Sequence, residues 1–164
     1  MALFLGIDQS FSSTGTVILD EESNIIDVSI ISSPKTVDFF ERAWIISQEL
    51  NNLIYKYKPS HIALEGLAFG GMGNATRQLS GLQYTIINSF RKDPNILIDC
   101  LIIPPTTVKK FATTKGSSKK EELYNCLPDY AKDRFTEMGL KKTKGLYDCV
   151  DAFWISKYLQ EQNK

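Results

Sequence analysis

The chain of 164 residues lacks a long hydrophobic run, a basic N-terminal region and an excess of charge of either sign. No apolar stretch approaches the ~20 residues that span a bilayer, and no secretory signal is recognisable, so we expect a cytoplasmic protein without a membrane partner. The 19 basic and 19 acidic side chains balance, so no global electric field indicates a nucleic-acid partner. The length suits one compact domain over residues 1–164, without internal repeats or linkers.

Cysteine and histidine are also scarce. Cys100, Cys126 and Cys149 are odd in number, widely spaced and match no zinc pattern. We interpret them as free, buried or half-buried thiols in a reducing compartment. His61 is the single histidine and begins a predicted strand, so a structural role is favoured over metal binding.

Hydrophobic patterning near the N-terminus predicts a small antiparallel sheet. Residues 2–8 form a near-continuous apolar run that ends at Asp8, which is typical of a buried strand. Residues 14–19 and 25–31 follow after short turns, and their alternation predicts two further strands. The short turns imply an antiparallel meander of three strands.

A long helix and a second acidic strand come next. Residues 36–57 carry a helical stripe that includes Trp44, which we expect to lie in the core, as we do Trp154 on the last helix. Residues 61–65 form a short strand that ends at Glu65. The order strand, helix, strand implies a crossover, so this strand should run parallel to the first and lie beside it.

The second half of the chain continues this alternation. A glycine-rich loop at 66–73 precedes a helix that Asn74 can cap. The elements expected are a helix over 74–91, a strand over 96–103, short helices near 106–113 and 118–126, an irregular stretch to Thr143, and a final helix over 146–160. The pattern predicts an α/β fold, a mixed five-stranded sheet with helices on both faces.

Four carboxylates stand out in this arrangement. Asp148 and Asp151 lie three residues apart on the final helix, and therefore project from one side of it. Apolar residues on nearly every other side indicate that the helix is mostly covered. If the strands that end at Asp8 and Glu65 are neighbours, this helix can bring all four carboxylates together.

A cluster of four carboxylates would repel itself unless hard cations neutralise it. All-oxygen ligands favour Mg²⁺ or Mn²⁺ over zinc. Two such ions ~3.5–4 Å apart are a known device for in-line phosphodiester hydrolysis. The sequence therefore predicts a two-metal phosphodiesterase site.

The order and spacing of these motifs resemble a known family. Gly6-Ile7-Asp8 follows an apolar strand, Ala63-Leu64-Glu65 follows a helix, and Asp148-Cys149-Val150-Asp151-Ala152 lies near the C-terminus. Together they are similar to the RuvC family of Holliday-junction resolvases, part of the RNase H-like superfamily. The small size and irregular tail resemble bacteriophage members, which would act in the host-cell cytoplasm.

The resemblance implies an RNase H-like fold and a crossover junction endodeoxyribonuclease active in DNA recombination and repair. Asp8, Glu65, Asp148 and Asp151 would be the catalytic ligands of two Mg²⁺ ions, with Mn²⁺ as a substitute and without a nucleotide cofactor. The substrate would be four-way junctions. Whether forks or flaps are also cleaved does not follow from the resemblance. The two-fold symmetry of a junction implies a homodimer, for which the helix over 74–91 is a plausible contact.

This chain also departs from the family pattern. Gln9-Ser10 stands where Pro-Gly often follows the first aspartate, and the segment 127–145 is longer than its usual counterpart. These departures bear on junction sequence preference and substrate breadth more than on catalysis.

Lysines form two clusters that could contact phosphates. Lys109 and either Lys119 or Lys120 match family lysines near the DNA backbone, and Lys110 lies beside them. The second cluster is Lys141, Lys142 and Lys144. Lysine runs are usually solvated faces, but a neutral DNA-binding protein must concentrate its positive charge somewhere.

The glycine-rich loop carries two apolar side chains, Phe69 and Met72, next to Glu65. One interpretation is that they wedge between bases at the branch point, and the other is that they pack on the protein's own core. The loop lacks the Gly-Lys-Ser/Thr ending of a nucleotide-binding P-loop.

Two alternative functions remain at this point. Gly6-Ile7-Asp8-Gln9-Ser10 also resembles the first phosphate loop of actin-like ATPases and sugar kinases, although those proteins need two such domains and much more chain. A junction-binding protein that no longer cleaves is the other alternative, and the presence of all four carboxylates argues against it.

Overall fold

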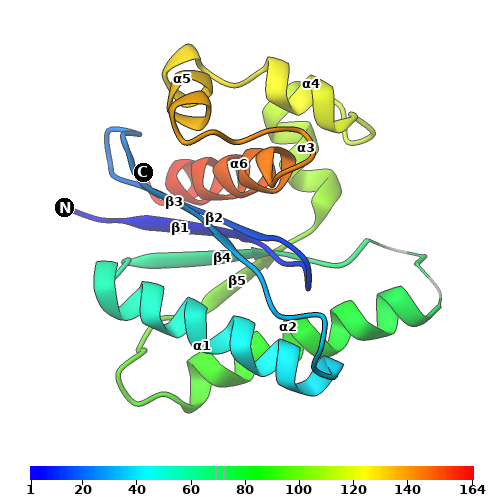
Figure 1. Ribbon diagram of the computed structural model, residues 1–164. Helices are drawn as coiled ribbons and strands as arrows, with labels where there is room; N and C mark the ends of the chain where they lie inside the picture. The colour runs from blue at the N-terminus through cyan, green and yellow to red at the C-terminus, as the bar shows by residue number, and fades with distance from the viewer. Residues whose placement is uncertain (69, 72) are drawn as a thin grey trace.

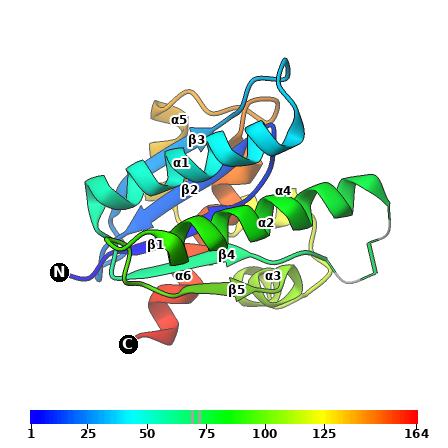
Figure 2. The same ribbon diagram turned by 90° about the horizontal axis from the view of Figure 1, so that it is seen from below.

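The computed structural model describes residues 1–68, 70–71 and 73–164. A five-stranded sheet separates two layers of helices, with α1 (Phe39–Tyr57) and α2 (Asn74–Lys92) on one face (Figure 1). The opposite face is covered by α6 (Leu146–Gln162), over which lie α3 (Pro105–Thr113), α4 (Lys120–Asn125) and α5 (Asp129–Glu137). The view from below shows α1 and α2 lying side by side across the sheet (Figure 2).

The sheet has the order β3-β2-β1-β4-β5. Its strands are β1 (Phe4–Asp8), β2 (Thr14–Leu19), β3 (Ile25–Ile31), β4 (His61–Glu65) and β5 (Cys100–Ile103). β1, β2 and β3 pair antiparallel, whereas β4 pairs parallel with both β1 and β5. The predicted meander, the crossover and the mixed five-stranded sheet are therefore confirmed.

Three predicted boundaries were wrong. β5 begins at Cys100 rather than at residue 96, because the apolar Ile96 is buried against α1 and α2 without pairing to a strand. The stretch before Thr143, expected to be irregular, contains α5, a polar helix that buries only Ala131 and Phe135. Gly73, and not Asn74, occupies the cap position of α2, and no side chain caps that helix.

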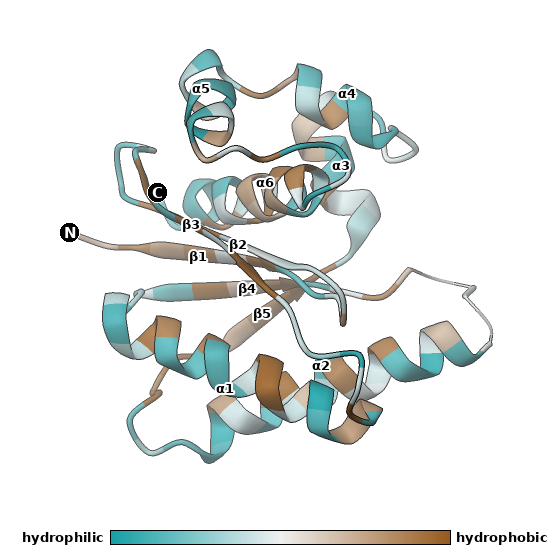
Figure 3. Cartoon of the chain, in the orientation of Figure 1, coloured by the Kyte–Doolittle hydropathy of each residue, from teal (hydrophilic) through white to brown (hydrophobic). Residues whose placement is uncertain are grey.

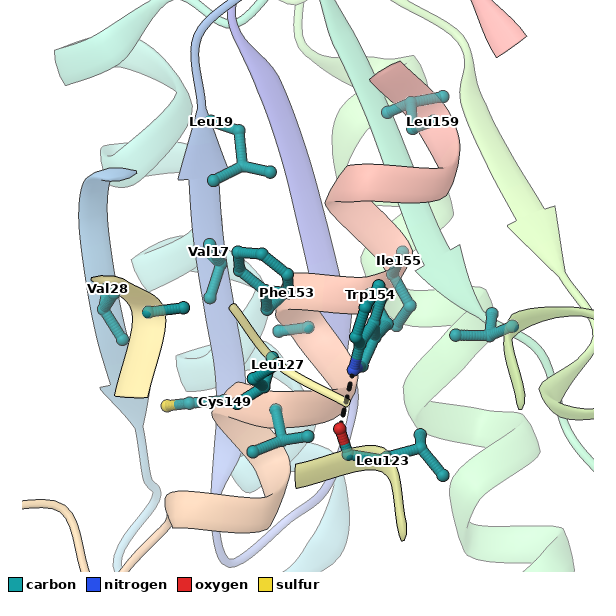
Figure 4. Packing of buried hydrophobic residues seen from close by; sticks show 14 of the residues in the cluster. Val17, Leu19, Val28, Leu123, Leu127, Cys149, Phe153, Trp154, Ile155 and Leu159 are labelled. Carbon is teal, nitrogen blue, oxygen red and sulfur yellow. Dashed lines mark hydrogen bonds between the residues drawn. The ribbon is translucent and has the colours of Figure 1, made fainter. Parts of the chain in front are cut away.

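The two faces of the sheet form separate cores because alternate side chains of a strand point to opposite faces. Leu5 and Ile7 of β1 pack toward α1 and α2, while Phe4 packs toward α6. Coloured by hydropathy, α6 shows apolar positions within the protein and the outer helices show polar ones (Figure 3). In the α6 core, Trp154 Nε1 donates a hydrogen bond of 3.1 Å to the Leu123 oxygen, which joins α6 to α4 (Figure 4).

α6 lies unusually close to the sheet. A Cβ atom added to Gly6 of β1 would overlap the Ala152 carbonyl oxygen, and one added to Gly15 of β2 would overlap the main chain of Asp148. Ser156 Oγ also donates a buried hydrogen bond of 2.7 Å to the Phe4 oxygen. Two glycines and one serine thus fix the depth at which α6 sits on β1 and β2.

The predictions for tryptophan and cysteine are only partly confirmed. Trp154 is buried, but Trp44 is 53% exposed, because α1 buries the face that carries Ala43, Ile46 and Leu50. Cys149 is buried and Cys100 half-buried, as expected, whereas Cys126 is exposed at the end of α4. His61 stacks on Phe4 with 5.1 Å between the ring centroids, in keeping with a structural role.

None of the helices in the described part of the chain combines the length and apolar character that a membrane span requires.

Candidate active site

Asp8 and Glu65 leave the sheet at the same edge. β1 and β4 are adjacent and parallel, and the last paired residues are Ile7 and Leu64, one position before each carboxylate. The two carboxyl groups are close enough that the charge of Glu65 helps to raise the pKa of Asp8, after the larger effect of burial. The prediction that the two acidic strands are neighbours is confirmed.

α6 brings two further carboxylates to this edge. Asp148 is in the first turn of α6, where Gly15 allows the helix main chain to approach β2. Ser13 Oγ donates a hydrogen bond of 2.7 Å to Asp148 Oδ2 and so orients that side chain. Asp151 follows one turn later on the same side of the helix.

All four carboxylates line one cavity of about 410 Å³. Lys109 of α3 and Lys120 of α4 line the same cavity. The remaining lining residues are Gln9, Ser10, Gly66, Leu67, Ala68, Leu79, Pro105 and Leu123. Lys110 and Lys119, the other two lysines predicted to contact DNA, are exposed and do not line this cavity.

Phe69 and Met72, the two side chains of the wedge hypothesis, lie outside the residues that the structure describes.

Burial and mutual repulsion disfavour negative charge in this cavity. Burial, followed by the charges of Glu65 and Asp151, raises the pKa of Asp8 well above its ordinary value. Burial, together with Glu65, raises the pKa of Asp151 to about 7, even though Lys120 and Lys109 act in the opposite direction. The pKa of Glu65 is raised by burial as well.

The chemistry of these side chains fits a hard divalent cation. They present only oxygen donors, and in the described residues none of the four forms an ion pair with lysine or arginine. A cation would also remove the repulsion that raises the pKa values of Asp8 and Asp151.

The carboxylates line the cavity without converging on one point. Asp148 is turned toward Ser13, whose Oγ donates to its Oδ2. Within the described ranges, no three His, Cys, Asp or Glu side chains are already arranged as a set that could hold a metal ion. Metal binding would therefore require side-chain rotation within the cluster.

Gln9 and Ser13 were not identified as site residues from the sequence. Gln9 is 7% exposed, and its Nε2 donates to the Glu65 main-chain oxygen at 3.2 Å and to Gln83 Oε1 of α2 at 3.0 Å. The signal available was the polar turn directly after Asp8, which separates Gln9 and Ser13 by only three residues. Their partners lie 56 to 135 residues away and could not be read from that turn.

Comparison with known proteins gives one consistent result, although no family model matches the chain. The crossover junction endodeoxyribonuclease RuvC of Petrotoga mobilis is 28% identical over 153 residues, which cover 92% of this chain and 88% of the relative. RuvC of Prochlorococcus marinus strain NATL1A is 27% identical over 157 residues, covering 93% of this chain and 94% of that protein.

A solved structure extends this likeness to the fold. Thermus thermophilus RuvC in complex with a Holliday-junction substrate superimposes with a TM-score of 0.75 over 99% of this chain and 93% of that one, at 16% identity. The mixed sheet and its helical layers thus have the RNase H-like arrangement predicted from the motifs. The resemblance first seen in three short acidic motifs extends over nearly the whole chain, which is a homologue of the RuvC Holliday-junction resolvases.

Proposed function

We propose that residues 1–164 form one nuclease domain, a metal-dependent endonuclease that hydrolyses phosphodiester bonds in branched DNA. The observation that carries this proposal is the meeting of Asp8, Glu65, Asp148 and Asp151 around one cavity, with Lys109 and Lys120 at its wall. The curated relatives, named as crossover junction endodeoxyribonucleases, support the same reaction class.

Each group has a distinct role in this proposal. The four carboxylates are the ligands of two Mg²⁺ ions, for which Mn²⁺ substitutes. When bound, such ions supply an activated water and stabilise the leaving oxygen. Lys109 and Lys120 hold the phosphate backbone beside the carboxylates, and the exposed Lys110 and Lys119 extend that contact to neighbouring phosphates.

Asp8 and Asp151 give the site its dependence on metal. Because burial and neighbouring carboxylates raise their pKa values, these groups hold protons more readily than ordinary aspartates. A divalent cation competes with those protons, so that binding of the metal releases them.

The two alternatives are less well supported. An actin-like or sugar-kinase domain has no use for Asp148 and Asp151, and the comparisons lead to resolvases instead. A junction-binding protein that does not cleave would not require four carboxylates around one cavity.

The test is cleavage of a labelled four-way junction and of a matched linear duplex, with Mg²⁺ or with EDTA. We expect cleavage of the junction only, and only with Mg²⁺. Asp8→Asn and Asp148→Asn should abolish cleavage and leave junction binding intact. Full activity of Asp8→Asn in Mg²⁺ would contradict the mechanism, and ATP hydrolysis without DNA would favour the kinase-like alternative.

We further propose a homodimer formed through the outer surface of α1 and α2. This surface exposes Phe40 (88%), Trp44 (53%) and Tyr84 (66%), an unusually aromatic group for solvent contact. A two-fold pair would present two cavities to the two symmetric strands of a junction. Light scattering should give twice the chain mass, and the double variant Phe40→Ser, Trp44→Ser should give the mass of a monomer.

A further inference from the structure

Positive charge in this neutral chain is concentrated in one segment. Residues 105–145 contain ten of the 19 lysines and arginines but only five of the 19 aspartates and glutamates. The segment therefore carries a net charge of +5, and the rest of the chain carries a net charge of −5. It includes α3 and α4, which contribute Lys109 and Lys120 to the cavity.

The lysines of this segment differ in whether they are paired. Lys132 and Arg134 of α5 form ion pairs with acidic residues of their own helix. Among the described residues, seven lysines of the segment form none: Lys109, Lys110, Lys115, Lys119, Lys120, Lys141 and Lys144. Two of these, Lys109 and Lys120, line the cavity, and charge that is left unneutralised there is available to an anionic ligand.

Three lysines are presented on one ordered turn. Lys141, Lys142 and Lys144 are all exposed, and Lys144 N donates a hydrogen bond of 2.8 Å to the Lys141 oxygen. Leu146 N donates to that same oxygen at 3.2 Å, which ties the turn to the start of α6. Gly145, with φ of 72°, lies against Ile30 of β3.

This turn is continuous with the rim of the cavity. Lys120, which lines the cavity, has its ammonium 5.9 Å from the ring centre of Tyr147. Tyr147 is adjacent to Asp148 and follows the turn by three residues. The start of α6 lies at the same edge of the molecule as the ends of β1 and β4 (Figure 1). Lys141–Lys144 thus extend the basic surface outward from the carboxylates.

We propose that the turn Lys141–Lys144 is a second phosphate-binding surface, which holds the backbone of a DNA arm that leaves the cavity. The inference rests on the proposed function and names a part of the substrate that the cavity does not reach. Three like charges within four residues repel one another, and a row of phosphates is the ligand that relieves this repulsion.

Glu121 acts as the counter-charge of this surface in the free protein. Its Oε1 lies 2.9 Å from Lys142 Nζ, and both side chains are largely exposed. A DNA phosphate would take the place of the Glu121 carboxylate on Lys142. Removing the charge of Glu121 should therefore strengthen DNA binding, an effect opposite to that of removing the lysines.

The test compares three variants in binding of a four-way junction at several salt concentrations, in EDTA so that no cleavage occurs. K141A/K144A should weaken binding roughly tenfold or more and lower the slope of log K against log salt by about 1–2. E121Q should strengthen binding, on the order of twofold to tenfold. K56A/K164A is the control, with the same charge change at two exposed sites, in the last turn of α1 and at residue 164, and it should bind like the wild type.

The outcomes separate this inference from the function on which it rests. If the wild type binds and cleaves the junction while K141A/K144A matches K56A/K164A, the second surface is wrong and the nuclease proposal stands. If E121Q brings no gain, Glu121 is not a counter-charge and the inference also fails. If circular dichroism shows that K141A/K144A is misfolded, the inference is tested by E121Q alone, which should bind the junction more tightly than the wild type. A wild type that binds no junction would overturn both proposals.

Discussion

The side chain of Gln9 is hydrogen-bonded to the main-chain oxygen of Glu65, with Nε2 as the donor at 3.2 Å. The paired residues of β1 and β4 end at Ile7 and Leu64. The Gln9 side chain therefore adds one more hydrogen bond between the two chain segments, just beyond the last strand pair. The same Nε2 donates to Gln83 Oε1 on α2 at 3.0 Å. The buried amide of Gln9, the residue that follows β1, therefore connects the end of β1 to the main chain at the end of β4 and to α2.

Replacement of Gln9 by methionine should slow cleavage without loss of DNA binding. Methionine keeps the length of the side chain but cannot donate to the main-chain oxygen of Glu65, so the end of β4 that carries the Glu65 carboxylate is held less firmly. We expect cleavage to fall on the order of 10–100-fold, in the range seen when groups that orient metal ligands are removed, with junction affinity within about threefold. Single-turnover rates and filter binding measure the two quantities.

The control for this variant is Gln83→Leu, which removes only the α2 partner and leaves the Gln9 bond to Glu65 intact. It should slow cleavage less than Gln9→Met does. Equal rates for Gln9→Met and the wild type would show that Glu65 is held by other contacts.

Alanine at Gly6 or Gly15 should destabilise the fold strongly. The added methyl group would overlap the main chain of α6, which cannot move as a flexible side chain can. We expect a loss of about 3 kcal/mol or more in the free energy of unfolding, or no folded protein.

Gly81→Ala is the matched control, because no atom lies within 4 Å of its added Cβ. In the middle of α2 that change should stabilise by about 0.5–1 kcal/mol. Urea unfolding gives all three values, and a stable Gly6→Ala variant would contradict the close approach of α6.

Asparagine at Asp151 should stabilise the metal-free protein, and more so at higher pH. The pKa of Asp151 is about 7 in the folded protein and near its ordinary value when unfolded, so between about pH 4 and 7 the folded state binds more protons. Its contribution to stability therefore falls as pH rises through that window. The full shift corresponds to about 4 kcal/mol, which solvent in the cavity should reduce to about 1–2 kcal/mol.

The measurement is the difference in unfolding free energy between Asp151→Asn and wild type, in EDTA, at pH 4.5 and at pH 8. This difference should favour the variant increasingly toward pH 8. A difference that stays constant with pH would mean that the Asp151 pKa is not raised.

Divalent metal should raise the melting temperature of the wild type at neutral pH. A ligand that binds only the folded state at 100 times its Kd adds about 2.7 kcal/mol of stability. Asp8→Asn, which lacks one of the proposed ligands, should gain clearly less from Mg²⁺ or Mn²⁺. Calorimetric scans in EDTA and in excess metal test this without any DNA, and equal gains in the two proteins would exclude Asp8 as a ligand.

Several features of this protein follow from the sequence by itself. The bounds of β2, β3 and β4 agree with the predicted ranges 14–19, 25–31 and 61–65. The placement of Asp8 and Glu65 at the ends of neighbouring strands also follows, because strand periodicity is local and a strand–helix–strand unit constrains how its strands pair.

Other features were decided only by the tertiary structure. Trp44 lies on an apolar stripe yet is exposed, because the face of α1 that is buried depends on where the sheet and α2 lie. The bond from Ser13 to Asp148 and the bond from Gln9 to Gln83 join residues 135 and 74 positions apart. Local patterning specifies which residues are strand, helix or turn. The partner of a polar side chain depends instead on the depth at which elements pack, which Gly6, Gly15 and Ser156 set for α6.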